Sequence, residues 1–175
     1  MKILACILSS LLAAPVFAQT AASAPTDPWK RLAFLEGTWD ANATGSGGAA
    51  VMGTYTFSLE LRNHVLARHA TSKTECKGPT DFDCEHADLL YIYQDSPGQT
   101  LKAIYFDNEG HVIHYEVSSP NARSALFLSD ASEPGPQFRL TYELKDAILW
   151  VRFQMRPPGQ TDWKTYLEWS GAKVK

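Results

Sequence analysis

Long apolar runs and clusters of positive charge are both scarce in this chain of 175 residues. Its N-terminal apolar run, Ile3 to Leu12, is far shorter than the roughly 20 residues that a membrane-spanning helix needs, and no later run approaches that length. The 16 Lys and Arg residues form no basic cluster and are outnumbered by 19 Asp and Glu residues, for a formal net charge of −3. Nucleic-acid binding needs a concentrated basic face. We therefore expect a protein that neither spans a membrane nor binds nucleic acid.

Local motifs for catalysis and metal binding are also lacking. No G-x-S-x-G segment offers a nucleophile, and the five histidines lie in the middle of the chain: His64, His69, His86, His111 and His114. The two-residue period of a strand points His111 and His114 to opposite faces, and His64 and His69 fail as a metal pair for the same reason. The sequence therefore predicts no catalytic residue and no metal ligand.

Two polar segments are predicted to be loops. Asp81, Asp83, Glu85 and Asp88 lack the order of acids and the central glycine of a calcium loop, so we expect a solvated face there. The glycine-rich run at residues 45–48 is followed by no lysine and no helix, which a phosphate-binding loop requires. It is predicted to be a flexible loop between the first two strands.

The N-terminus has the features of a targeting segment. Lys2 supplies a positive charge, an apolar region follows, and Val16 and Ala18 place small residues at a cleavage site. We therefore expect a signal peptide at residues 1–18, a flexible leader at 19–26, one domain at 27–175, and a periplasmic or secreted location. Loss of Cys6 with the signal peptide leaves Cys76 and Cys84, which we expect to form a structural disulfide in an exported protein.

From Asp27 onward the pattern predicts a short helix and then strands only. Asp27 and Pro28 suit a helix start, and Gly37 suits the stop after a helix over residues 28–35. Alternation of apolar and polar residues then predicts about ten strands, at 37–44, 52–62, 65–75, 87–95, 100–107, 111–118, 124–129, 137–144, 148–156 and 163–170. Because closure removes exposed edges, we expect an all-β, up-and-down antiparallel barrel with the helix closing one end.

The segment from Leu32 to Trp39, LAFLEGTW, resembles the opening of lipocalin-like (calycin) barrels. It is especially similar to bacterial secreted lipocalin-like domains of unknown function and, more distantly, to nitrobindin-type barrels. The resemblance implies that Trp39 packs at the closed end below the helix, next to Gly37, and that the interior holds a hydrophobic ligand. Nitrobindin-type barrels also hold haem through a late histidine, whereas this chain has no histidine after His114.

We therefore interpret the chain as a barrel that binds a small apolar or amphipathic molecule. The cavity candidates are His69, Tyr55, Phe57, Tyr105, Tyr142 and Phe153. His69 is the histidine expected to face the interior, and haem at His69 is a minor alternative to a barrel without cofactor. Two further alternatives stay open: an enzyme that uses a barrel histidine, and a filled barrel that binds a protein partner or forms a homodimer through its outer aromatic side chains.

Overall fold

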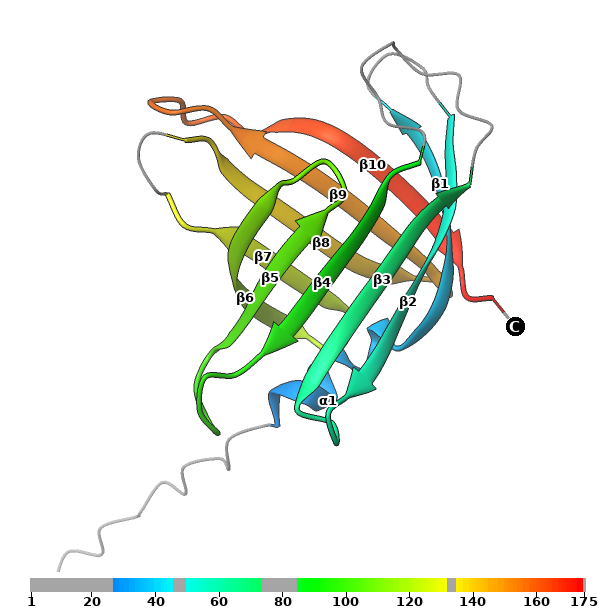
Figure 1. Ribbon diagram of the computed structural model, residues 1–175, viewed down its shortest axis with the longest axis vertical. Helices are drawn as coiled ribbons and strands as arrows, with labels where there is room; N and C mark the ends of the chain where they lie inside the picture. The colour runs from blue at the N-terminus through cyan, green and yellow to red at the C-terminus, as the bar shows by residue number, and fades with distance from the viewer. Residues whose placement is uncertain (1–26, 46–49, 74–84, 132–134, 175) are drawn as a thin grey trace, which may run out of the picture.

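Ten antiparallel strands form a closed barrel (Figure 1) in the computed structural model, which describes residues 27–45, 50–73, 85–131 and 135–174. Each strand pairs with its neighbours along the chain, and the first strand pairs with the last. Every strand therefore has a partner on both sides, so no edge of the sheet is left open. The predicted all-β barrel with one short N-terminal helix is confirmed.

The strand limits agree with those expected from the sequence to within about three residues. They are β1 Gly37–Gly45, β2 Ala50–Glu60, β3 Val65–Lys73, β4 Ala87–Tyr93, β5 Leu101–Asp107, β6 Val112–Asn121, β7 Ser124–Ser129, β8 Gln137–Lys145, β9 Ile148–Arg156 and β10 Lys164–Ala172.

The helix α1, Pro28–Leu32, begins as its sequence predicts. The side chain of Asp27 accepts a hydrogen bond of 3.0 Å from the backbone N–H of Trp29, and Pro28 occupies the first turn, where a missing N–H does no harm. A 3₁₀ turn, η1 Ala33–Leu35, continues the helix. Gly37 then adopts a φ of +108°, which favours glycine and turns the chain into β1.

The helix lies at one end of the barrel, at the bottom of Figure 1. Arg31 donates a hydrogen bond of 2.9 Å to the carbonyl of Ser119 near the end of β6, and the indole N–H of Trp39 donates one of 2.8 Å to the carbonyl of Leu35. Large apolar side chains fill the half of the barrel near the helix, among them Leu32, Leu35, Phe57, Leu66, Leu90, Ile92, Phe127 and Leu149. This half of the interior is therefore a packed core.

Several expectations fall outside the described residues. These are the signal peptide at residues 1–18, the leader at 19–26, and the disulfide between Cys76 and Cys84. In the segments that the structure does describe, we find no helix with the length and apolar character needed to cross a membrane.

Candidate functional site

The half of the barrel away from α1 contains a cavity of about 130 Å³. Its lining comes from the strand ends farthest from the helix, such as Asp88 at the start of β4 and Tyr105 at the end of β5. Much of the wall is apolar and consists of Ala41, Ala70, Ile113, Leu140, Phe153, Leu167 and Trp169. The barrel is therefore filled at the helix end and hollow at the other.

Three of the six predicted cavity residues line this space: Tyr55, Tyr105 and Phe153. Phe57 and Tyr142 face the interior too, but they are buried in the packed core and do not line the cavity. Their rings lie edge to face with centroids 5.5 Å apart, which closes the space between them.

The sixth residue, His69, is not in the interior. Its side chain is 49% exposed and lies 3.1 Å from the carboxylate of Glu60 on the outer face of the barrel. The expected inward position was wrong because Leu66, Arg68 and Ala70 are the residues of β3 that face the interior, and His69 alternates with them. This placement removes His69 as a ligand for haem inside the barrel.

At the floor of the cavity lies a buried ion pair that the sequence analysis missed. Arg68 on β3 is 3% exposed, and Asp88 on β4 is 9% exposed. The guanidinium donates hydrogen bonds to the carboxylate of Asp88 and to the hydroxyl of Tyr142 on β8. Burial opposes the charge on Arg68, but Asp88 raises the pKa of the guanidinium, which stays protonated.

Asp88 is ionised for the same reason. Burial alone would raise the pKa of its carboxyl, but the charge of Arg68, together with hydrogen bonds from His86 and Arg68, lowers that pKa below its usual value of 3.8. Asp88 was expected to belong to a solvated acidic face. That expectation was wrong, because Asp88 starts a strand and shares its inward face with Leu90 and Ile92.

Two polar atoms on this floor make no well-aligned hydrogen bond among the described residues, although the indole N–H of Trp169 lies close enough to the Tyr55 hydroxyl to offset part of the rise that burial causes in its pKa. They are the Nε of Arg68 and the hydroxyl oxygen of Tyr55, both on side chains that are almost fully buried. Both residues line the cavity. A buried donor without a partner costs free energy, so such atoms call for a ligand or a bound water.

The phenols around the cavity are neutral donors. Burial raises the pKa of Tyr55, Tyr105 and Tyr115 well above the usual value of 10.0, and burial raises that of Tyr142 to about 12. The hydroxyl of Tyr105 lies 3.2 Å from a carboxylate oxygen of Asp107 and 3.3 Å from Nε2 of His86.

The backbone of Asp88 lies near the rim, directly opposite Asp107 across β4 and β5, and its side chain extends inward to Arg68 at the floor. Two carboxylates in this position repel one another. Each has its own compensating partner: Arg68 for Asp88, and His111, whose Nδ1 is 2.9 Å away, for Asp107. His86 adds a further contact, with Nε2 3.4 Å from a carboxylate oxygen of Asp88.

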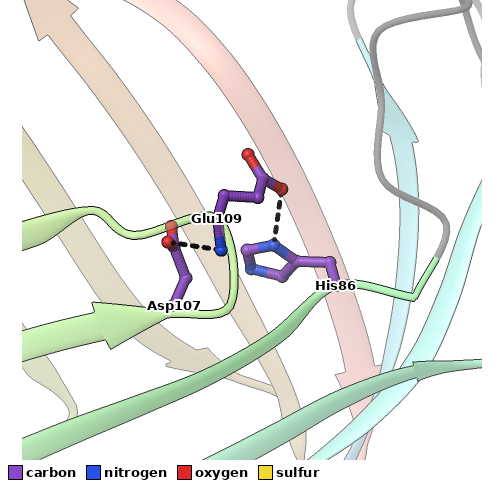
Figure 2. A group of neighbouring side chains, drawn as sticks. All are labelled: His86, Asp107 and Glu109. Atoms are coloured by element: carbon purple, nitrogen blue, oxygen red, sulfur yellow. Dashed lines mark hydrogen bonds and ion pairs between the residues drawn. The ribbon is translucent and has the colours of Figure 1, made fainter.

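Figure 2 shows His86, Asp107 and Glu109 at this rim, where the segment before β4 meets the turn after β5. One nitrogen or oxygen from each lies within 4.8 Å of the others, so the three could hold a metal ion. Hydrogen bonds already engage the group, however. His86 lies 3.1 Å from Glu109, and one oxygen of Asp107 accepts the backbone N–H groups of Glu109 and His111. These contacts explain the cluster as the anchor of the β5–β6 turn.

These neighbours favour the protonated form of His86. The hydrogen bond to Asp88 raises the pKa of the imidazole, partial burial opposes the shift, and the hydrogen bond to Glu109 raises it further. Since both ring nitrogens face carboxylates, His86 offers no free nitrogen to a metal in this arrangement.

Haem does not fit this interior. The cavity is smaller than the roughly 300–1,000 Å³ of sites for drug-sized ligands, and haem is at least as large as those ligands. Of the histidines, His69 points outward and His86, which lines the cavity, is bound between two carboxylates.

A sequence signal did exist for the ion pair. Arg68 follows Leu66 and Asp88 precedes Leu90 with the spacing of a single strand face. One charge of each sign on the apolar faces of two consecutive strands predicts a buried pair, since burial of either charge alone is very unfavourable.

Comparison with known proteins gives no relative from which a site could be transferred: no model of a protein family and no curated protein matches this chain.

Proposed function

We propose that this protein binds a small amphipathic molecule inside its barrel. The observation that carries the proposal is the pairing of an apolar wall with two buried donors that have no acceptor among the described residues, the N–H at Nε of Arg68 and the O–H of Tyr55. The apolar part of the ligand would pack against side chains such as Phe153 and Leu167, and its polar part would meet the floor. A site of this composition is typical of small-molecule pockets.

The size of the cavity limits the ligand. A cavity of about 150 Å³ in another protein admits a molecule the size of benzene, and the cavity here is about 130 Å³. The ligand is therefore a single ring or a short chain rather than a long fatty acid or a macrocycle.

The contacts around His86 favour binding over catalysis. Its two ring nitrogens face the carboxylates of Asp88 and Glu109, so neither nitrogen is free to take a proton from a substrate. Burial raises the pKa of Tyr105 well above the usual value of 10.0, which keeps that phenol protonated at neutral pH.

The architecture is consistent with the lipocalin-like resemblance of the N-terminal segment, because a helix covers one end of a closed barrel and the ligand site lies toward the other. In this proposal the protein is exported to the periplasm or secreted, and it acts there as a carrier or sensor of its ligand.

Isothermal titration calorimetry with acetophenone, a small amphipathic ring, tests the proposal directly. By the usual ligand efficiency we expect a Kd on the order of 100 µM. Replacement of Ala70, which lines the cavity, by Leu fills part of the space and should weaken binding at least tenfold.

Ala87→Leu is the matched control. Ala87 alternates with the inward-facing Asp88 along β4, so its side chain points to the outer face. This variant should bind acetophenone like the unchanged protein. Equal binding by the Ala70→Leu variant would show that acetophenone sits elsewhere and would refute the proposed site.

A further inference from the structure

The floor of the cavity presents hydrogen-bond donors whose charge is already balanced. Among the described residues, Arg68 is the one guanidinium that lines the cavity, and the carboxylate of Asp88 neutralises it. Because its pKa is raised above 6.5, His86 is a second cation of the lining at about pH 6, and it lies between Asp88 and Glu109. Two cations thus face two carboxylates, and the wall contributes no uncompensated positive charge.

The neighbouring groups do not change this balance in favour of an anion. Tyr55, Tyr105 and Tyr115 are neutral phenols, since burial raises their pKa. Asp107 lies behind Tyr105, 3.2 Å from its hydroxyl, and adds a further negative charge on that side. An anionic ligand would therefore be buried beside carboxylates without a counter-ion of its own, which is strongly unfavourable.

The unpartnered atoms, in contrast, require an acceptor. The N–H at Nε of Arg68 can only donate, and the hydroxyl of Tyr55 donates as well as accepts. A neutral oxygen acceptor that reaches either donor satisfies it and brings no charge into the interior.

We infer that the polar group of the ligand is an uncharged oxygen acceptor, an inference that rests on the proposed ligand-binding function. A ketone, aldehyde, ester or amide carbonyl fits the site, whereas a carboxylate or a phosphate does not. The buried pair of Arg68 and Asp88 thus selects against anions, because Asp88 neutralises the charge of the guanidinium while the guanidinium still offers hydrogen-bond donors.

Three probes of similar size distinguish a neutral acceptor, an apolar group and an anion. They are acetophenone, cumene and benzoate, which each carry one ring and the same number of non-hydrogen atoms. They are titrated by calorimetry at about pH 6, where benzoate is ionised and where His86, whose pKa is raised above 6.5, is protonated. Acetophenone should bind about tenfold tighter than cumene, the ratio expected of one or two net hydrogen bonds. It should also bind at least about tenfold tighter than benzoate, because a buried anion without a counter-ion is disfavoured.

Each other outcome has a definite meaning. If benzoate binds tightest, the site takes an anion and the inference is wrong. If cumene equals acetophenone, the ligand is bound by apolar contact alone and the inference is again wrong, although the proposed function stands. If none of the three binds, the proposed function itself fails.

Asp88→Asn tests the charge argument within the site. The amide keeps the shape and an acceptor for Arg68 but removes one negative charge. The affinity for benzoate should then rise about tenfold relative to that for acetophenone, because Arg68 is left as a cation without a counter-ion at the floor. An unchanged ratio in a folded variant would overturn the inference.

Tyr55→Phe keeps the inference testable if Asp88→Asn does not fold. Loss of the hydroxyl should reduce acetophenone binding about threefold and leave cumene binding unchanged. Tyr93→Phe is the matched control, because Tyr93 faces outward on β4. An acetophenone affinity that is the same in all three proteins would show that Tyr55 does not contact the ligand oxygen and would count against the inference.

Discussion

The guanidinium of Arg68 and the carboxylate of Asp88 meet inside the barrel, although 20 residues separate them along the chain. Their positions follow from register: Ala70 pairs with Asp88 and Arg68 pairs with Leu90, so the two side chains are diagonal neighbours on one face of β3 and β4. Each residue is tolerated in the interior because the other is present.

Removal of one partner should therefore destabilise the fold strongly. We expect Arg68→Met to lower the free energy of unfolding by about 3–5 kcal/mol, since it leaves Asp88 as a buried charge without its cation. Urea-induced unfolding measures the loss. The double variant with Asp88→Leu should be less destabilised than the sum of the single variants, and additive losses would contradict a direct coupling.

His86 should make stability depend on pH. Its pKa in the folded protein is raised above the usual value of 6.5, so its contribution is fully present below about pH 6.5 and is lost as the pH rises through the folded value. The difference in unfolding free energy between the protein and its His86→Gln variant should thus shrink from about pH 6 to about pH 9.

The control for this series is His114→Gln, at an exposed position of β6. Urea unfolding should show a loss of less than about 0.5 kcal/mol for that variant, as is usual for an exposed position. A difference for His86→Gln that grows with pH would mean that the carboxylates of Asp88 and Glu109 do not hold the imidazole as a cation.

Most of the fold could be predicted from the sequence because alternation is a local property. The alternation in Phe138, Leu140 and Tyr142, for example, marks β8 without any knowledge of its neighbours. The same applies to the helix start, where Asp27 and Pro28 carry the information within two positions.

The site could be predicted only in part, because alternation does not say which face of a strand points inward. One face of β3 carries Val65, Ala67 and His69 and is uncharged when the histidine is neutral. The other face includes the charged Arg68. A strand considered alone therefore favours His69 inside. The true choice depends on Asp88, which lies on another strand and compensates the arginine.

Trp39 should stabilise the closed end of the barrel. Its ring is 3% exposed, and its N–H donates to the carbonyl of Leu35 in η1. We expect Trp39→Phe to cost about 1–3 kcal/mol of unfolding free energy, because the buried carbonyl loses its donor. Trp150→Phe, at a side chain that is 52% exposed, should cost less than about 0.5 kcal/mol in the same urea experiment. Equal losses would mean that the Trp39 hydrogen bond contributes nothing.

Gly171 should be intolerant of any side chain, because β1 and β10 approach closely there. A Cβ added at this position would lie 1.7 Å from the backbone carbonyl oxygen of Asp40, and a backbone atom cannot move aside as a flexible side chain does. We expect Gly171→Ala to lower the unfolding free energy by about 3 kcal/mol or more, at the upper end of the range for overpacked interiors. Ser170→Ala, on the opposite face of the same strand, should cost less than about 1 kcal/mol.

Because β1 and β10 close the barrel, the Gly171→Ala variant should also lose amide hydrogen-exchange protection first at the β1–β10 pairing. Protection that stays unchanged there while it falls elsewhere would show that the seam is not the site of strain.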